Sequence, residues 1–250
     1  MPQPPSPAVC AAWIRDHGPA VALTGAGVST AAGIPDFRGP EGLYATGRYD
    51  ADTVFRIDAF QRDPEPFYAF TRDFLAILDR VQPTRTHRIL SAMEAAGFLE
   101  VVVTQNIDPL HEAAGSRNVL AVHGNYWTSH CLACGEAWTF EALRASLART
   151  AGAPRCRCGG CIKPDVVFFG EPVHALPEAQ AAVLEAGVLL VLGSSLTVHP
   201  AAALPAYAPG PVVVVNRGPV ALPPGPDRHF VDADLDSYLG AVADELGLDA

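Results

Sequence analysis

A glycine-rich stretch, GAGVS at 25–29, directly follows a short apolar run. Glycine leaves backbone N–H groups free to approach a phosphate, and the N-terminus of a following helix attracts an anion. Thr30 stands where the G-x-G-x-x-G fingerprint has its third glycine, which disfavours a hydride-transferring dehydrogenase. The stretch predicts a phosphate-binding turn of another kind, with a purely structural tight turn as the alternative.

The next stretch, GIPDFRGPEGLY at 33–44, sets an acid, an aromatic ring and a base among Gly and Pro residues. We interpret it as a lid, in which Phe37 covers a reactive ring and Arg38 lies near phosphates. A structural pair of Asp36 and Arg38 that closes the loop is the alternative.

Three polar clusters each follow an apolar run: TQNID at 104–108, HG at 123–124 and GSS at 193–195. If the runs are parallel strands, their carboxyl ends meet at one edge of the sheet, where α/β proteins bind ligands. An imidazole with an unperturbed pKa of about 6.5 suits a general base. His123 is therefore a candidate catalyst, and a structural hydrogen-bonding histidine is the alternative.

Six cysteines are present, and five of them lie within 131–161. In a reducing compartment such a cluster favours a metal over disulfides. Cys131 and Cys134 have the spacing of a zinc knuckle, with Gly135 allowing the turn. Tetrahedral zinc needs two more thiolates, and CRCGGC at 156–161 offers either a C-x-C or a C-x-x-C pair.

Short β-branched runs that end in polar or glycine-rich loops predict buried parallel strands. The runs span 20–23, 99–103, 119–122, 188–192 and 212–215, and helical patterns alternate with them at 9–16, 64–79, 86–96, 177–186 and 235–246. This order predicts an α/β fold with a Rossmann-like doubly wound parallel sheet.

Two stretches break this rhythm and predict a smaller domain. One is a helical insertion at 44–79 and the other a zinc-binding ribbon at 126–164. The large domain then comprises 1–43, 80–125 and 165–250, with a Pro- and Gly-rich surface loop at 219–227.

Composition narrows the class of function. The formal charge of −10 argues against binding to a nucleic-acid backbone and is compatible with a cationic peptide substrate. No apolar run approaches the roughly 20 residues that span a bilayer, and the first residues lack the features of a signal peptide. We expect a cytoplasmic protein that does not bind membranes.

The basic residues are unevenly divided between the two types. Of the 17 basic residues, only Lys163 is a lysine, and the others are arginines.

Taken together, the motifs resemble those of the sirtuin family, in particular a bacterial deacetylase-like member, over about 9–243. The motifs are GAGVSTAAGIPDFRGPEGLY, TQNIDPLHEAAG, VHGN, the paired cysteine ribbon, IKPDVVFFGE, GSSLTVHPAA and VVVVN. The resemblance implies an enzyme that consumes NAD to deacylate protein lysines, yielding nicotinamide, O-acyl-ADP-ribose and free lysine. Protein mono-ADP-ribosyl transfer at the same NAD site is the alternative, and a catalytically idle NAD-binding or zinc-ribbon module is a third hypothesis.

The resemblance also implies roles for individual residues. His123 would activate the ribose hydroxyl after nicotinamide has left, Asn106 would orient the ribose or a water, and Asp108 would hold the nicotinamide carboxamide. The cofactor site would be lined by Gly25, Ala26, Gly27, Thr30, Asp36, Phe37, Arg38, Gln105, Ile107, Gly193, Ser194, Ser195 and Asn216. The acyl-lysine peptide would bind Val167, Phe168, Phe169, Gly170, Glu171, Leu196 and Val198, although the first three are explained equally well as ordinary core.

Counted back from Ile162, the family pattern puts one zinc ligand at Cys158 and another beside Cys156. The expected ligands of a structural zinc are therefore Cys131, Cys134, Cys156 and Cys158, with Cys158 and Cys161 as the alternative second pair.

Members of the family that prefer succinyl or malonyl groups carry a Tyr-x-x-Arg pair. Here Thr71 stands at the arginine position, and Arg72 follows one residue later. One residue on a helix turns a side chain by about 100°, so Arg72 should point elsewhere. We expect neutral acyl groups, acetyl first.

Overall fold

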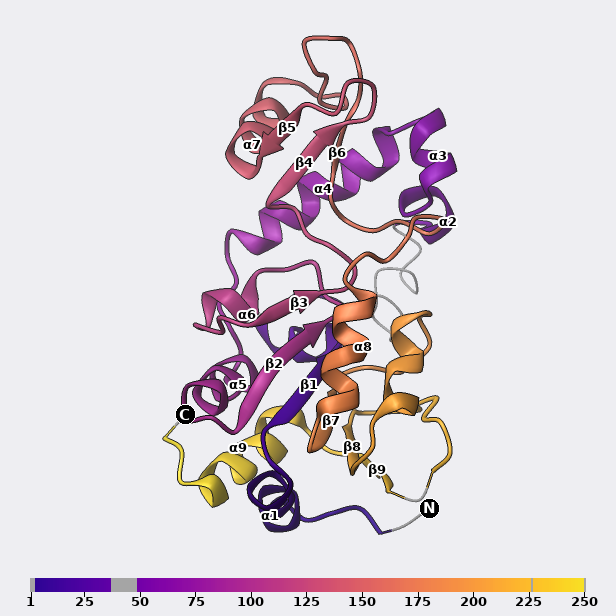
Figure 1. Cartoon of the computed structure of the whole chain (residues 1–250). Helices are drawn as coiled ribbons and strands as arrows, with labels where there is room; N and C mark the ends of the chain where they lie inside the picture. Colours follow the sequence, from indigo (N-terminus) through magenta and orange to yellow (C-terminus); the bar gives the residue numbers. More distant parts are fainter. Residues whose placement is uncertain (1–2, 37–48, 226, 250) are drawn as a thin grey trace. The chain divides into compact units, whose positions relative to one another are not determined.

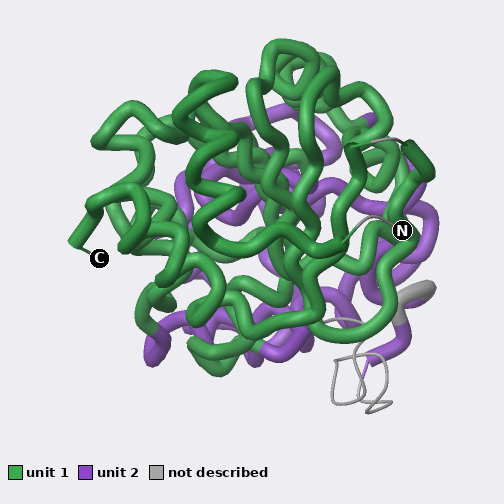
Figure 2. Tube along the Cα trace, turned by 90° about the horizontal axis from the view of Figure 1, so that it is seen from below, with its two compact units in different colours: residues 1–34, 82–122, 173–250 green, residues 35–81, 123–172 purple. Residues whose placement is uncertain are grey.

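The computed structural model describes residues 3–36, 49–225 and 227–249. The chain forms two compact units, coloured green and purple in Figure 2. Unit 1 comprises Met1–Ile34, Gln82–Val122 and Val173–Ala250, and unit 2 comprises Pro35–Val81 and His123–Pro172.

Unit 1 is built on a parallel sheet with the strand order β3-β2-β1-β7-β8-β9 (Figure 1). The strands are β1 (Ala20–Thr24), β2 (Leu99–Thr104), β3 (Val119–Ala121), β7 (Val188–Leu192), β8 (Val212–Val215) and β9 (Arg228–Val231). The four central strands are almost wholly buried, as expected for a parallel sheet covered on both faces. The chain order reverses between β1 and β7, so the switch point of the doubly wound sheet lies there.

Helices cover both faces of this sheet because alternate strand residues point to opposite sides. On one face, Ala22 and Leu190 belong to a core with α1 (Pro7–His17), α5 (Arg85–Ala95) and α9 (Leu235–Leu246). On the other face, Leu23 and Val191 belong to a core with α8 (Leu176–Glu185) and the 3₁₀ segment η3 (Ala201–Tyr207). The short segments η1 (Ala26–Val28), η2 (Thr30–Ala32) and α6 (Leu110–Ala113) follow the ends of β1 and β2.

Unit 2 combines a helical part with a small antiparallel sheet of order β5-β4-β6. Its elements are α2 (Ala51–Val54), α3 (Ile57–Arg62), α4 (Glu65–Leu78), β4 (Thr128–Cys131), β5 (Ala137–Thr139), α7 (Phe140–Arg149) and β6 (Ile162–Pro164). An aromatic core fills the helical part. Phe67 of α4 lies at its centre, with ring centroids 4.9 Å from Phe168 and 5.4 Å from Phe60.

The predicted fold class is confirmed, and the five expected strands and five expected helices are all present. Several elements were not predicted, among them the edge strand β9 and helix α7. Strand β9 begins with the polar residues Arg228 and His229 and only its last residue, Val231, is buried, so its hydrophobic signal is weak. Helix α7 lies inside 126–164, which was predicted as a zinc-binding ribbon. A signal for this helix was present, because Thr139 is a typical N-cap residue and accepts a hydrogen bond from Ala142 N at 3.3 Å.

The segment 165–172 lies in unit 2, whereas the sequence placed it in the large domain. Backbone pairing is the reason, since Val167 N donates to His123 O at 2.8 Å and Phe169 N donates to Phe55 O at 2.8 Å. Within the described residues, no helix is both long and apolar enough to cross a membrane.

Candidate active site and metal centre

Two glycine-containing loops pack tightly at the switch point of the unit 1 sheet. Gly25 N donates to Leu192 O at 2.9 Å, and Gly27 N donates to Gly193 O at 2.9 Å. A Cβ on Gly27 would lie 2.6 Å from Gly193 Cα, and a Cβ on Gly193 would lie 2.6 Å from Val28 N. Glycine is therefore required at both positions by close backbone approach, and Gly193 also has a φ of +62°.

A chain of buried hydrogen bonds joins the loop after β1 to the loop after β2. Asn106 Nδ2 donates to Gly25 O and to Ser29 Oγ, both at 3.2 Å, and Ser29 Oγ donates to Asp108 Oδ2 at 2.9 Å. Asp108 Oδ1 accepts from Leu110 N at 3.1 Å. These bonds fix the orientation of both the Asn106 amide and the Asp108 carboxyl group.

Burial raises the pKa of Asp108, and the hydrogen bonds from Leu110 and Ser29 partly offset that rise. A buried carboxyl group at a sheet switch point is suited to hold a polar ligand group such as a carboxamide.

The remaining unit 1 candidates lie around the same strand ends. Gln105 Nε2 donates to Ser194 Oγ at 3.0 Å, and this bond links the loops after β2 and β7. Thr30 Oγ1 donates to Gly27 O at 3.0 Å and so closes the turn after β1. Ile107 is buried, Ser195 Oγ bonds Thr197 Oγ1, and Asn216 Nδ2 donates to Arg217 O directly after β8.

In unit 2, His123 is a half-buried residue whose backbone lies beside the segment 165–167. Its carbonyl oxygen accepts from Val167 N at 2.8 Å, and Asn125 N donates to Asp165 O at 3.3 Å. A Cβ on Gly124 would lie 1.8 Å from Asp165 O, and Gly124 has a φ of +70°. Glycine after His123 is thus required by this pairing.

The candidate peptide-binding residues differ in exposure. Phe169 is 43% exposed and Gly170 is exposed, whereas Phe168 is 1% exposed and packs in the aromatic core of unit 2. Val167 and Glu171 are half-buried. In unit 1, Leu196 is buried with a φ of +54°, and Val198 is half-buried. Phe168 and Leu196 therefore contribute packing with their side chains.

Four cysteine thiols of the ribbon converge. The sulfur atoms of Cys131, Cys134, Cys156 and Cys158 all lie within 4.8 Å of one another. Gly135 and Gly159 adopt φ values of +74° and +88°, which close the two knuckles. Four sulfur ligands that converge from two knuckles suit tetrahedral zinc, and such a set leaves no position for a substrate. Cys161 is outside this group, and its thiol donates to Ile162 O at 3.3 Å.

The comparisons with known proteins agree with this geometry. The Sir2 family matches residues 25–200. The chain belongs to the Sir2 family. An NAD-dependent protein deacetylase of Sulfolobus acidocaldarius is 45% identical over 74% of this chain and 73% of its own length. NAD-dependent protein deacetylase 1 of Geobacillus kaustophilus is 40% identical over 94% of this chain and 96% of its own length. A solved Sir2 variant with deacetylated p53 peptide and 3′-O-acetyl ADP ribose superposes with a TM-score of 0.87, at 37% identity, covering 96% of this chain and 98% of that one.

Membership of the Sir2 family confirms the resemblance drawn from the motifs. Phe37 and Arg38 of the expected lid lie outside the described residues, while Asp36 is described and half-buried. Two polar residues with buried contacts, Ser29 and Lys163, were not among the site residues expected from the sequence. Ser29 stands at the end of the glycine-rich stretch 25–29, and a hydroxyl-bearing residue in a candidate phosphate-binding turn was the available signal. Lys163 was noted only for composition, although a single lysine in a 250-residue chain is itself a signal.

Proposed function

We propose that this chain is an NAD-dependent protein-lysine deacetylase that converts NAD and an acyl-lysine protein or peptide into nicotinamide, O-acyl-ADP-ribose and free lysine. The observation that carries the proposal is the buried chain from Asn106 through Ser29 to Asp108, at the switch point of a Sir2 chain. The names of the relatives and the bound peptide product of the structural neighbour support the same activity.

The strand ends of unit 1 suit NAD. Gly25, Gly27 and Gly193 let the loops after β1 and β7 pack closely at the strand ends, and Asp108 offers a buried carboxyl group for a carboxamide. We propose that unit 1 is the NAD-binding domain and that the helical and ribbon parts of unit 2 form the small domain. NAD supplies an electrophilic ribose carbon, and the departing nicotinamide needs no general acid.

We propose that the imidazole of His123 acts as the general base and takes the proton of a ribose hydroxyl. Its backbone is held by Val167, and Gly124 permits that contact. The backbone of Gly170 and Glu171, with that of 196–198, would bind the peptide by main-chain hydrogen bonds, so sequence preference would be modest. Zinc held by the four thiolates would support folding, and the free thiols suit a cytoplasmic, reducing compartment.

The test is product analysis by mass spectrometry after incubation with NAD and an acetyl-lysine peptide. We expect free-lysine peptide, nicotinamide and O-acetyl-ADP-ribose. The variant His123→Ala should lose deacetylation by about 100-fold or more while nicotinamide release falls less. His174→Ala, which removes an exposed imidazole, is the matched control. ADP-ribose attached to protein without loss of the acetyl group would instead indicate mono-ADP-ribosyl transfer, and unchanged deacetylation in His123→Ala would refute the role of His123.

A further inference from the structure

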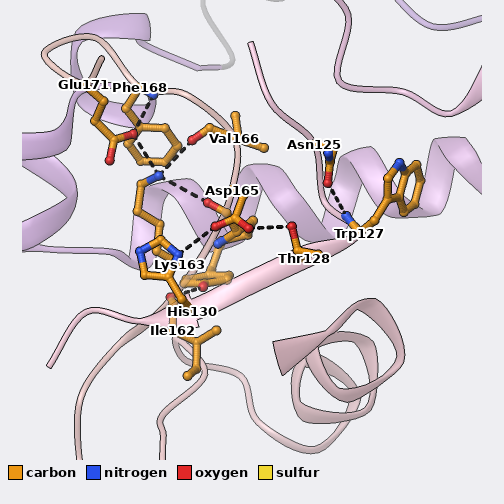
Figure 3. A network of polar contacts seen from close by, with 12 residues as sticks. Asn125, Trp127, Thr128, His130, Ile162, Lys163, Asp165, Val166, Phe168 and Glu171 are labelled. Carbon is orange, nitrogen blue, oxygen red and sulfur yellow. Dashed lines mark hydrogen bonds and ion pairs between the residues drawn. The ribbon is translucent and has the colours of Figure 1, made fainter. Parts of the chain in front are cut away.

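Lys163 is the only lysine of the chain, and it is buried in unit 2 with 2% of its side chain exposed. Its ammonium group donates to Glu171 Oε2 and Val166 O, both at 2.8 Å, and to Pro164 O at 3.2 Å (Figure 3). The nitrogen also lies 4.2 Å from the centroid of the Phe168 ring. An ammonium group has three donors, so all three are used within the segment that follows Lys163.

Glu171 completes this arrangement from the other end of the segment. The same Oε2 atom that contacts Lys163 accepts a hydrogen bond from Phe168 N at 2.8 Å. The ion pair thereby joins the two ends of 163–171, and its members also bond to backbone groups inside the segment. A buried ion pair contributes little net stability because desolvation offsets the attraction. Its directional bonds to the backbone nevertheless specify one conformation of the segment.

The segment closed by this ion pair contacts the parts of unit 2 that carry the proposed chemistry. Val167 N takes no part in the ion pair and instead donates to His123 O at 2.8 Å. Phe169 N donates to Phe55 O at 2.8 Å, and Ile57 N donates to Phe169 O at 3.2 Å, while the Phe169 ring is exposed. One segment therefore contacts the backbone of His123 and exposes Phe169 and Gly170 at the surface.

We propose that Lys163 is a positioning residue for substrate binding: with Glu171 it fixes the segment 164–171 so that the backbone of Gly170 and Glu171 can bind the acyl-lysine peptide. The inference rests on the proposed function, because it takes the peptide as the ligand of that segment. Lys163 itself touches neither the peptide nor NAD. Replacing it with an apolar side chain leaves the Glu171 carboxylate without its cation and two carbonyl groups without their donor, while the bond from Phe168 N to Glu171 remains.

The test compares Lys163→Met, Lys163→Arg, Glu171→Gln and the double variant Lys163→Met/Glu171→Gln. The dissociation constant of a fluorescent acetyl-lysine peptide is measured without NAD, and KM values for peptide and NAD are measured in turnover. We expect Lys163→Met to weaken peptide binding and raise the peptide KM by about 10-fold, with the NAD KM changed by less than about two-fold. Lys163→Arg should retain part of the binding. The double variant should bind better than Lys163→Met because the unpaired carboxylate is gone.

Arg144→Met is the matched control, since it removes one cation from the exposed pair of Arg144 and Asp79 on the same unit. We expect the control to bind peptide as the wild type does. Hydrogen exchange of the segment 164–171 should be faster in Lys163→Met and unchanged in Arg144→Met. Unchanged peptide binding in Lys163→Met, or equal rises of both KM values, would overturn the proposal. If Lys163→Met does not fold, as judged by thermal unfolding, Glu171→Gln and Lys163→Arg decide by the same criteria. A wild-type chain that binds the peptide without deacetylating it would refute the proposed function alone.

Discussion

Ser29, in the loop after β1, donates its hydroxyl hydrogen bond to Asp108, in the loop after β2, with 2.9 Å between Oγ and Oδ2. The same hydroxyl oxygen accepts from Asn106 Nδ2, so the direction of the Ser29 proton is fixed. A serine from the loop after β1 thus orients two side chains from the loop after β2. This relationship makes Ser29 a positioning residue for the proposed NAD site.

Removing that hydroxyl should weaken NAD binding. In Ser29→Ala, the buried Asp108 carboxyl group loses one donor and the Asn106 amide loses one acceptor. Because an unsatisfied buried group costs about 1–3 kcal/mol, we expect the NAD KM to rise about 5- to 150-fold. Steady-state kinetics with varied NAD measures this, and peptide affinity without NAD serves as the internal control. An NAD KM equal to that of the wild type would contradict the prediction.

Removing the metal should unfold the ribbon of unit 2. The four thiols that converge belong to two knuckles, and a structural zinc supplies folding free energy directly. We expect about one zinc per chain by elemental analysis, loss of activity on chelation, and recovery when zinc is returned. Cys134→Ser should lower zinc content, whereas Cys161→Ser should retain it because Cys161 lies outside the group. Equal zinc loss in both variants would contradict the ligand set.

Two buried histidines of unit 1 should make the fold sensitive to acid. Burial lowers the pKa of His87 to about 4 and that of His111 to about 3, and the two rings lie 4.6 Å apart. The unfolded chain protonates both below about pH 6.5, whereas the folded chain keeps them neutral, so their stabilising effect is complete above that pH and is lost as the pH falls toward the folded values.

We therefore expect the free energy of unfolding to fall by up to about 1.4 kcal/mol per pH unit for each of these histidines below about pH 6. Urea unfolding at several pH values measures the slope. The slope should be smaller in His87→Gln and His111→Gln, while His174→Gln, at an exposed position, is the matched control. A slope unchanged in both buried variants would contradict the assignment.

The enzyme should prefer neutral acyl groups. Arg72 does point away from its helix neighbour Thr71, since its Nη2 atom donates to Thr150 O at 2.9 Å and to Gly152 O at 2.8 Å. Thr71 is buried and donates to Phe67 O at 2.9 Å. We expect acetyl-lysine peptide to be turned over at least about 10-fold faster than succinyl-lysine peptide, because a buried carboxylate without a cation is costly. Comparison of kcat/KM for the two peptides checks this, and faster turnover of the succinyl peptide would overturn it.

Lys163 should resist chemical acylation in the folded chain. Its amine is 2% exposed and its donors are held by Glu171 and two carbonyl groups, so a reagent in solution cannot reach the nitrogen. After brief treatment with an acetylating reagent, peptide mapping should show an unmodified Lys163. The same reagent in urea should modify it, which is the matched control. Stoichiometric acetylation of the folded chain would contradict the burial of this ion pair.

Local pattern alone predicted much of this fold. Runs such as VLLVL at 188–192 and VVVV at 212–215 are typical of strands buried on both faces, and they became the central strands β7 and β8. The edge strand β9 was not predicted, because its sequence carries little hydrophobic signal and it is stabilised as a strand by pairing with β8. The structure groups segment 165–172 with unit 2 through contacts that the sequence does not show, since its partners Phe55 and His123 are distant from it in sequence.

The sequence by itself determined the family, the strand and helix order, and the cysteine knuckles, because each depends on residue types at short fixed spacings. Only the tertiary structure decided which side chains meet. It joined Asn106, Ser29 and Asp108 in one buried chain, separated Cys161 from the four converging thiols, and closed the segment after Lys163 with Glu171. Such contacts depend on how loops that are distant in sequence pack in three dimensions. Burial sets the strength of each polar interaction, and side chains become buried only when the chain folds.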